Sequence, residues 1–282
     1  MNGIELKDIS KKYKNVQALS HVNLCFKENT IYGLLGRNGA GKSTLLNIIN
    51  NRVLADNGTV TLNGKTATEN TEVLHNFFLT NEQNLYPEGM KVKDAFKWSS
   101  EFYPGFDKDY AEKLCNLFQL SHKKKIKRLS TGYQTIFRNI VALSVNVPYV
   151  FLDEPVLGLD AYHRDLFYKI LIEKYAENPF TIVISTHLIE EISNVIENVI
   201  IIKNGEIIKN DSRDEILKAG YCISGISSAV DGYISGKQVI GTEILGGLKT
   251  AYILGQPETN IPDNLSISGM DLQKFFIQLT NS

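Results

Sequence analysis

The chain has 282 residues, of which 43% are hydrophobic and 22% charged, a balance typical of a folded globular protein rather than a disordered or fibrous one. Thirty lysines and arginines against 31 aspartates and glutamates give a formal net charge of −1. The chain as a whole therefore lacks the basic excess of a protein that binds nucleic-acid backbones non-specifically, and we expect no nucleic-acid partner. The length predicts one large α/β domain with a smaller appendage, or two modest domains.

Cysteine content and apolar patterning indicate a protein of a reducing compartment. Cys25, Cys115 and Cys222 are widely spaced and form no CxxC pair, so neither a disulfide framework nor a thiolate metal site is predicted. The first residues lack the apolar stretch of a signal peptide, and no window approaches the roughly 20 apolar residues that span a bilayer. We therefore expect a cytoplasmic protein whose membrane role, if it has one, depends on a partner.

The first part of the chain alternates short apolar runs with turn signals. The run 18–26 predicts a strand, and the run 31–35 predicts a second strand that ends at a glycine and leads into a helical pattern at 41–50. The segment 58–62 precedes Asn63-Gly64, a dipeptide typical of a type I′ hairpin turn. We therefore expect a strand, a glycine turn and a helix, followed by small antiparallel β-structure.

The middle of the chain predicts helices inserted between buried strands. Apolar residues at three-to-four spacing between about 92 and 122 indicate an inserted helical segment. The continuous apolar runs 149–152 and 181–184 are typical of strands in a parallel sheet that is covered on both faces. The segment 199–208 predicts a second hairpin, which turns at Asn204-Gly205.

The last part of the chain differs from the rest in residue composition. After Asp211, glycine-rich turns interrupt a stretch rich in serine, isoleucine and valine, and helical periodicity returns at 270–280. We therefore expect an α/β domain over residues 1–211, with a helical subdomain at about 86–145, and a small α+β extension of unknown role over 212–282.

A glycine-rich motif follows the predicted strand 31–35. It matches the pattern G-x-x-x-x-G-K-[ST] and opens a predicted helix, which is the context that phosphate binding requires. The glycines allow backbone N–H groups to surround a phosphate, the lysine reaches the β- and γ-phosphates, and the serine hydroxyl binds Mg²⁺. We predict a nucleotide-binding loop formed by Gly36, Asn38, Gly39, Gly41, Lys42, Ser43 and Thr44.

Two carboxylates follow the apolar run 149–152. Asp153 and Glu154 should lie at the carboxyl edge of the sheet, where open α/β sheets bind ligands. An Asp-Glu pair before Pro155 could simply end a strand at a solvated turn, but the phosphate loop favours a functional reading. We predict that Asp153 belongs to the Mg²⁺ shell and that Glu154 is the general base that orients the attacking water.

Between these motifs lies Leu129-Ser130-Thr131-Gly132-Tyr133-Gln134, and here the sequence resembles the ATP-binding cassette (ABC) family, whose signature is L-S-G-G-Q. The resemblance covers roughly residues 3–211. Thr131 and Tyr133 depart from the pattern in a way similar to ATPases of ABC-2-type exporters. The resemblance implies a P-loop NTPase cassette with a mixed parallel sheet, an antiparallel β subdomain and an inserted helical subdomain.

The resemblance also implies further site residues. Tyr13 stands where an aromatic ring stacks on adenine, Asp160 looks like the acid of the loop that reaches across a dimer, and His187 resembles the switch histidine that contacts the γ-phosphate. Two cassettes are then expected to pack head to tail around two ATP molecules. Each ATP would be capped by Ser130 and Gly132 of the second ATPase subunit, which is either identical or a paralogue.

Two further segments have alternative interpretations. The family's glutamine loop, a weak contributor to Mg²⁺ or water binding, falls on Gln83 or, in another register, on Asn81-Glu82. The run 123–128 holds five charges in six residues, which we interpret as a solvated loop in preference to a phospholipid or nucleic-acid contact.

The resemblance implies an ATPase that drives separately encoded transmembrane permease subunits from the cytoplasmic face of the membrane. It resembles cassettes of Gram-positive peptide or antibiotic exporters, including those that move phenol-soluble modulins. The helical segment, with aromatics that we expect to be exposed, is the expected docking surface (Tyr86, Trp98, Phe102, Tyr103 and Phe106). The alternative is a soluble ABC ATPase that acts on nucleic acid or ribosomes, but such proteins carry paired cassettes or long coiled-coil insertions, and neither occurs here.

Overall fold

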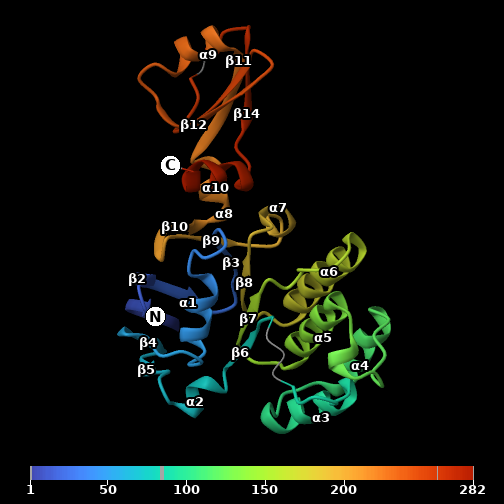
Figure 1. Ribbon diagram of the computed structural model, residues 1–282. Helices are drawn as coiled ribbons and strands as arrows, with labels where there is room; N and C mark the ends of the chain where they lie inside the picture. The colour runs from blue at the N-terminus through green and yellow to red at the C-terminus, as the bar shows by residue number, and fades with distance from the viewer. Residues whose placement is uncertain (1, 83–85, 259, 282) are drawn as a thin grey trace. The chain divides into compact units, whose positions relative to one another are not determined.

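The computed structural model describes residues 2–82, 86–258 and 260–281 (Figure 1). The chain divides into two compact units: Met1–His187 with Ile202–Ile208, and Leu188–Ile201 with Lys209–Ser282. Residues 188–201, which the sequence assigns to the cassette, group with the C-terminal residues. The predicted α/β class is confirmed, with a mixed sheet built largely from parallel strands and two further antiparallel sheets.

The six-stranded sheet carries the predicted buried strands at its centre. Its order is β10-β9-β3-β8-β7-β6, and β3, β8, β7 and β6 pair in parallel. β7 and β8 are buried almost throughout, which accounts for their unbroken apolar sequences. The strands are β3 (Ile31–Leu35), β6 (Phe77–Thr80), β7 (Tyr149–Asp153), β8 (Thr181–Thr186), β9 (Asn198–Lys203) and β10 (Glu206–Ser212).

The register of the parallel strands brings the predicted motifs to one edge. Leu35 lies beside Thr186, and Asp153 lies beside Ser185. The phosphate loop after β3, the carboxylates at the end of β7 and the histidine after β8 therefore leave the sheet at the same side, because parallel strands share their carboxyl edge.

An antiparallel sheet of order β2-β1-β4-β5 forms the start of the first unit. The predicted turn at Asn63-Gly64 is confirmed, and both residues have the positive φ that a type I′ turn requires. Of the strands in this sheet that the sequence analysis does not predict, β1 is the longest. The strands are β1 (Gly3–Tyr13), β2 (Val16–Lys27), β4 (Asn57–Leu62) and β5 (Lys65–Thr66).

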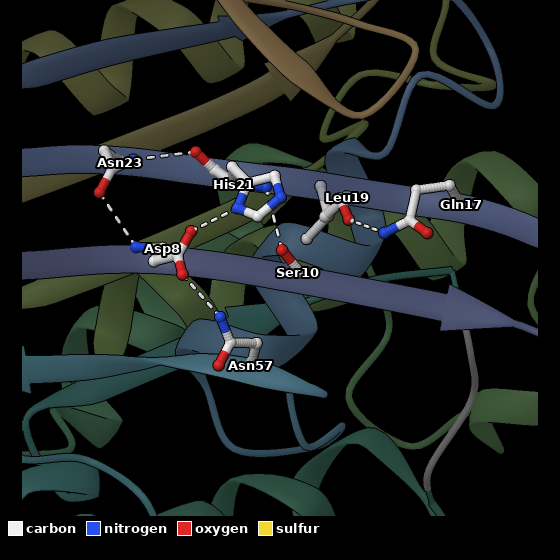
Figure 2. A network of polar contacts seen from close by, with 7 residues as sticks. All are labelled: Asp8, Ser10, Gln17, Leu19, His21, Asn23 and Asn57. Atoms are coloured by element: carbon white, nitrogen blue, oxygen red, sulfur yellow. Dashed lines mark hydrogen bonds and ion pairs between the residues drawn. The ribbon is translucent and has the colours of Figure 1, made fainter.

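Figure 2 shows a polar network across two opposed bulges of β1 and β2. Asp8 and His21 both have a positive φ, and the His21 ring nitrogen Nδ1 lies 2.6 Å from Asp8 Oδ1. Asn57 Nδ2 donates to the other Asp8 oxygen at 2.6 Å, and Asn23 Oδ1 accepts from the Asp8 backbone N–H at 3.0 Å. The Asn23 and Ser10 side chains thus satisfy the backbone N–H groups of Asp8 and His21, which the bulges remove from the ladder.

The helices of the first unit include the predicted inserted segment. The ring of Phe96 packs against those of Phe106 and Phe137 inside this segment. The expected exposure of Phe106 is therefore wrong, because its ring lies against Phe96 in the helical core and the residue is 7% exposed. Trp98 and Phe102 are exposed as expected, whereas Tyr86 and Tyr103 are only half-buried, and the ring of Tyr86 packs on Phe137. The helices are α1 (Lys42–Ile49), α2 (Thr71–Leu74), α3 (Val92–Phe102), α4 (Lys108–Leu117), the 3₁₀ helix η1 (Ile126–Arg128), α5 (Thr131–Ser144) and α6 (Ala161–Glu177).

The second unit contains a four-stranded antiparallel sheet of order β12-β13-β11-β14. Helix α9 covers one face over a core that includes Tyr221, Ile223, Val230 and Ile253, and the predicted C-terminal helix is α10. The elements are α7 (Ile189–Ile192), α8 (Arg213–Lys218), β11 (Gly220–Ile226), α9 (Ser227–Ile234), β12 (Gln238–Leu245), β13 (Leu248–Leu254), β14 (Leu265–Gly269) and α10 (Leu272–Asn281).

Among the residues that the structure describes, none of the helices combines the length and the apolar character needed to cross a bilayer.

Candidate nucleotide site

The phosphate loop connects β3 to α1 as predicted. Gly39 and Gly41 have φ values of 81° and 113°, in the region that favours glycine. A Cβ on Gly41 would lie 2.6 Å from the Ala18 carbonyl oxygen, so this position also requires a residue without a side chain. Helix α1 has no acidic residue in its first turn, which leaves its positive end available to an anion.

A turn from much later in the sequence holds this loop against β2. The Gly205 backbone N–H donates to the Ala40 carbonyl at 2.9 Å, and the Gly205 carbonyl accepts from the Ser20 N–H at 2.9 Å. A Cβ on Gly205 would lie 2.7 Å from the Ala18 carbonyl oxygen. The predicted Asn204-Gly205 turn therefore clamps the phosphate loop and needs its glycine.

Lys42 lies inside the loop it belongs to. Its Nζ donates to the Gly36 carbonyl at 2.7 Å and lies 4.0 Å from Glu154 Oε1. Burial lowers the pKa of Lys42, and the carboxylates of Glu154 and Asp153 partly offset that effect. The ammonium group is thus largely desolvated beside the carboxylates, where a phosphate oxygen could replace the carbonyl as its partner.

The two carboxylates are held by the three residues at the end of β8. Ser185 Oγ donates to Asp153 Oδ1 at 2.7 Å, and Thr186 Oγ1 donates to Glu154 Oε2 at 3.0 Å. The His187 ring nitrogen Nδ1 lies 2.9 Å from Glu154 Oε1. The sequence analysis selected His187 but gave no role to Ser185 and Thr186, although both precede it in the same run.

Glu154 also has an unusual backbone. Its φ of 50° lies in the left-handed region, which is uncommon for a residue other than glycine. Its N–H donates to the Ser185 carbonyl at 2.8 Å. Strained residues held in this way cluster at functional sites, so the backbone adds to the side-chain geometry in marking Glu154.

A cavity of about 440 Å³ adjoins these residues, a size within the range of small-molecule sites. Eight of the predicted residues line it: Asn38, Gly39, Gly41, Lys42, Ser43, Thr44, Asp153 and Glu154. Asn81 and Glu82, the alternative register of the glutamine loop, also line it, whereas Gln83 lies outside the described residues. Lining residues that the sequence analysis missed include Val16, Ala18 and Asn47.

The predicted adenine-stacking residue lies near this cavity without lining it. Tyr13 ends β1, is 44% exposed and pairs across the ladder with Val16, which does line the cavity. Lys11 Nζ lies 5.5 Å from the centre of the Tyr13 ring.

The signature residues form a separate group. Ser130 caps the N-terminus of α5, and its Oγ accepts from the Tyr133 N–H at 3.4 Å. Gly132 lies against the turn after β7, because a Cβ there would be 2.7 Å from the Gly158 carbonyl oxygen. Asp160 caps α6, and its Oδ1 accepts from the His163 N–H at 2.9 Å. None of these three predicted residues lines the cavity in the described structure.

Comparisons with known proteins agree with this geometry. The ABC transporter family profile matches residues 19–157. The ABC transporter ATP-binding protein YtrB of Bacillus subtilis is 30% identical over 213 residues, covering 76% of this chain and 73% of that protein. The solved ATP-binding subunit of an ABC transporter superposes with a TM-score of 0.68 at 23% identity, covering 76% of this chain and 92% of that one.

A dimeric post-hydrolysis state of an ATP-binding cassette bound to ADP and Pi superposes with a TM-score of 0.67 at 24% identity, covering 74% of this chain and 98% of that one. These two structural likenesses show a shared fold. The likeness to YtrB, with the family profile over residues 19–157, shows that the chain belongs to the ATP-binding proteins of ABC transporters, a family of ATPases.

Proposed function

We propose that this chain is the ATP-hydrolysing motor of a membrane exporter of the ABC-2 type, and that it dimerises around two ATP molecules to drive separately encoded transmembrane subunits. The observation that carries the proposal is the convergence of Lys42, Asp153, Glu154 and His187 at the carboxyl edge of the sheet beside a cavity. The variant signature around Thr131 and Tyr133 supports the exporter subtype, with peptides or antibiotic-like compounds as substrates.

Each part of the nucleotide site has its own role in ATP hydrolysis. Backbone N–H groups of residues 36–44 and the start of α1 bind the phosphates, and Lys42 exchanges its carbonyl partner for β- and γ-phosphate oxygens. Glu154 takes a proton from water as the water oxygen bonds to the γ-phosphorus. The bond from that phosphorus to the β–γ bridging oxygen breaks, and ADP and inorganic phosphate are the products. His187 binds the γ-phosphate, which draws its ring away from Glu154 and leaves that carboxylate oxygen free to accept from water.

The donor set fits Mg²⁺. Ser43 offers a hydroxyl and Asp153 a carboxylate, and both line the cavity. Within the described ranges no cluster of three or more His, Cys, Asp or Glu side chains could hold a metal. Mg²⁺ needs no such cluster, because it is commonly bound by one or two protein oxygens, substrate phosphates and water, and when bound it neutralises charge on the phosphates.

The separate location of Ser130, Gly132 and Asp160 supports a head-to-tail pair of cassettes. Ser130 and Asp160 are exposed, and neither lines the cavity of its own chain. A second cassette, identical or paralogous, would present its Ser130 and Gly132 to the bound ATP. Closure by ATP and opening after loss of the γ-phosphate contacts then provide two states whose balance the nucleotide controls.

An apolar groove supports docking of the transmembrane subunits at the cytoplasmic face of the membrane. It has a volume of about 420 Å³ and lies between β6 and α3. Aromatic side chains, which dominate interface cores, make up much of its lining (Phe78, Tyr86, Trp98, Phe102 and Tyr103).

Replacement of the proposed base tests the motor assignment. We expect Glu154→Gln to bind ATP, to lower kcat by about 10²-fold or more, and to accumulate as a dimer, since the amide cannot accept the proton. ATP hydrolysis and sedimentation with and without ATP are the measurements, with Glu112→Gln on the exposed face of α4 as the control. Hydrolysis by Glu154→Gln at the wild-type rate would refute the assignment of the base.

The transporter assignment has its own test. The neighbouring coding sequences are first searched for polytopic membrane proteins, and hydrolysis is then measured for the chain alone and after reconstitution with any that are found. We expect the membrane subunits to change the rate of hydrolysis, and their failure to bind the chain would refute the assignment.

A further inference from the structure

The folded chain brings two basic segments together on the helical part of the first unit. Residues 88–97 and 121–128 contain eight lysines and arginines against two acids, a formal net charge of +6 in a chain of net charge −1. The Val92 N–H donates to the Lys124 carbonyl at 3.1 Å, the Lys93 N–H to the His122 carbonyl at 3.0 Å, and the Ile126 N–H to the Met90 carbonyl at 3.0 Å. Backbone hydrogen bonds between the two segments, rather than proximity in the sequence, therefore bring these positive charges together.

The seven cations that form this surface are all exposed, and we call them the basic surface (Lys91, Lys93, Lys97, Lys123, Lys124, Lys125 and Arg128). Of the two acids in these segments, Glu88 pairs with Lys127, which is outside the basic surface, and Asp94, whose carboxylate accepts from the Lys91 N–H, offsets one of the seven positive charges. The basic surface therefore keeps most of its charge.

The arrangement places like charges next to one another. Lys91 and Lys125 face each other across a β-bridge, and Lys93 and Lys97 are one turn apart on α3. Both pairings are repulsive in the isolated chain. In the described part of the chain, the side chains of Lys93, Lys97, Lys123, Lys125 and Arg128 have no hydrogen bond or ion pair, so an external anion would relieve this repulsion.

Exposed aromatic side chains continue this surface along α3. Trp98 follows Lys97 directly and is 43% exposed, and Phe102, one turn further, is 66% exposed. Lysines combined with exposed aromatics are typical of surfaces at the membrane–water interface, where the rings enter the headgroup layer and the cations bind lipid phosphates. Trp98 and Phe102 also line the groove that we assign to the transmembrane subunits, so the basic surface lies beside that groove, where the membrane of the proposed function would supply anionic headgroups.

We propose that the basic surface binds the anionic phospholipid headgroups of the membrane that carries the transporter. This replaces the interpretation of the run 123–128 as a solvated loop, because its backbone pairing with residues 90–93 adds the lysines of α3 to those of the run. The inference rests on the proposed function, which brings the chain to a membrane, and it adds a contact that does not pass through the permease. Clusters of four to eight lysines and arginines bind anionic bilayers through additive electrostatic attraction. The contact should therefore weaken as ionic strength rises, because salt screens it.

Vesicle flotation of the purified full-length chain tests the proposal. One set of vesicles contains phosphatidylglycerol and phosphatidylcholine, and the other contains phosphatidylcholine alone. We expect binding only to the anionic vesicles, and at least a tenfold lower partition coefficient for the variant K93Q/K97Q/K123Q/K125Q. The matched control K27Q/K108Q/K113Q/K169Q makes the same charge change at exposed lysines outside the basic surface, and we expect it to stay within twofold of wild type.

Equal binding of the two variants, or no preference of the wild type for anionic vesicles, would overturn the proposal. A DNA duplex bound more tightly than the anionic vesicles, with that binding lost in the first variant, would overturn the lipid assignment as well. ATP hydrolysis by the same samples separates this inference from the proposed function. A wild-type chain that hydrolyses ATP but does not bind the vesicles would refute only the lipid contact. A wild-type chain that does not hydrolyse ATP would refute the motor assignment.

Discussion

Both carboxylate oxygens of Glu154 are held by residues that end the neighbouring strand. Thr186 Oγ1 donates to one oxygen, and the His187 ring lies against the other. If His187 turns to the γ-phosphate, Thr186 remains as the group that fixes the carboxylate. Thr186 is fully buried, so its hydroxyl has little freedom to exchange this partner for water.

Thr186→Val tests this positioning role, because valine keeps the shape of the side chain and removes only the donor. We expect kcat to fall by about tenfold, in line with the loss of a hydrogen bond to a charged group, while KM for ATP changes little. Steady-state hydrolysis by Thr186→Val and Thr186→Ser is the measurement, and serine should restore kcat. A fall in kcat that serine does not restore, or one that is equally large in a Glu154→Gln background, would count against positioning.

At the scale of elements, the start of α5 packs directly on the turn between β7 and α6. The close approach of Gly132 to the Gly158 carbonyl couples the signature residues to the residues that precede Asp160. A methyl group at position 132 must push these two segments apart, because its nearest neighbour is backbone.

We expect Gly132→Ala to weaken ATP-dependent pairing in the Glu154→Gln background by roughly tenfold, since overpacking of this kind costs about 1–3 kcal/mol. ATP binding to the single chain should be unchanged, because Gly132 does not line the cavity. Sedimentation with ATP measures the pairing. Gly232→Ala on α9, where a Cβ meets nothing within 4 Å, is the control, and an equal effect of both alanines would refute the explanation.

For the molecule as a whole, half-buried tyrosines predict a loss of stability at alkaline pH. Desolvation by burial raises the pKa of Tyr86 and of Tyr110 to about 12, above the ordinary value of 10.0. Between these values the unfolded chain loses the phenol proton and the folded chain keeps it. The free energy of unfolding should therefore be unaffected by these groups below pH 10 and should fall as pH rises from 10 towards 12.

Urea denaturation at pH 8, 9, 10 and 11 measures this dependence. We expect Tyr86→Phe to flatten the decline above pH 10, because phenylalanine has no proton to lose. Tyr162→Phe, at an exposed position on α6, should leave the decline as in wild type. A decline that both substitutions leave unchanged would show that other groups cause it.

The sequence predicts those parts of the fold whose signal is local. The glycine loop, the two hairpin turns and the unbroken apolar runs of β7 and β8 each carry their own pattern, and the predicted carboxylates line the cavity. β1 gives a weak pattern, because the bulge at Asp8 shifts the alternation of apolar and polar residues between Leu6 and Ile9.

Contacts between distant residues account for most of what was missed. The hydrogen bond from Thr186 to Glu154 depends on the register in which β7 and β8 pair, and that register cannot be predicted from the sequence of either strand alone. Burial of Phe106 depends on its packing against Phe96 of α3, and a short aromatic run cannot distinguish a core ring from an exposed one. The same reasoning applies to the basic surface, which requires residues 91–97 and 122–128 to meet.

The clamp that Gly205 places on the phosphate loop has a consequence for biosynthesis. Residues 36–44 leave the ribosome early, but the glycine that bonds to Ala40 and Ser20 is translated more than 150 residues later. A nascent chain arrested before residue 205 thus carries the whole nucleotide motif without the turn that secures it. Prematurely terminated products should accordingly be poor competitors for cellular ATP.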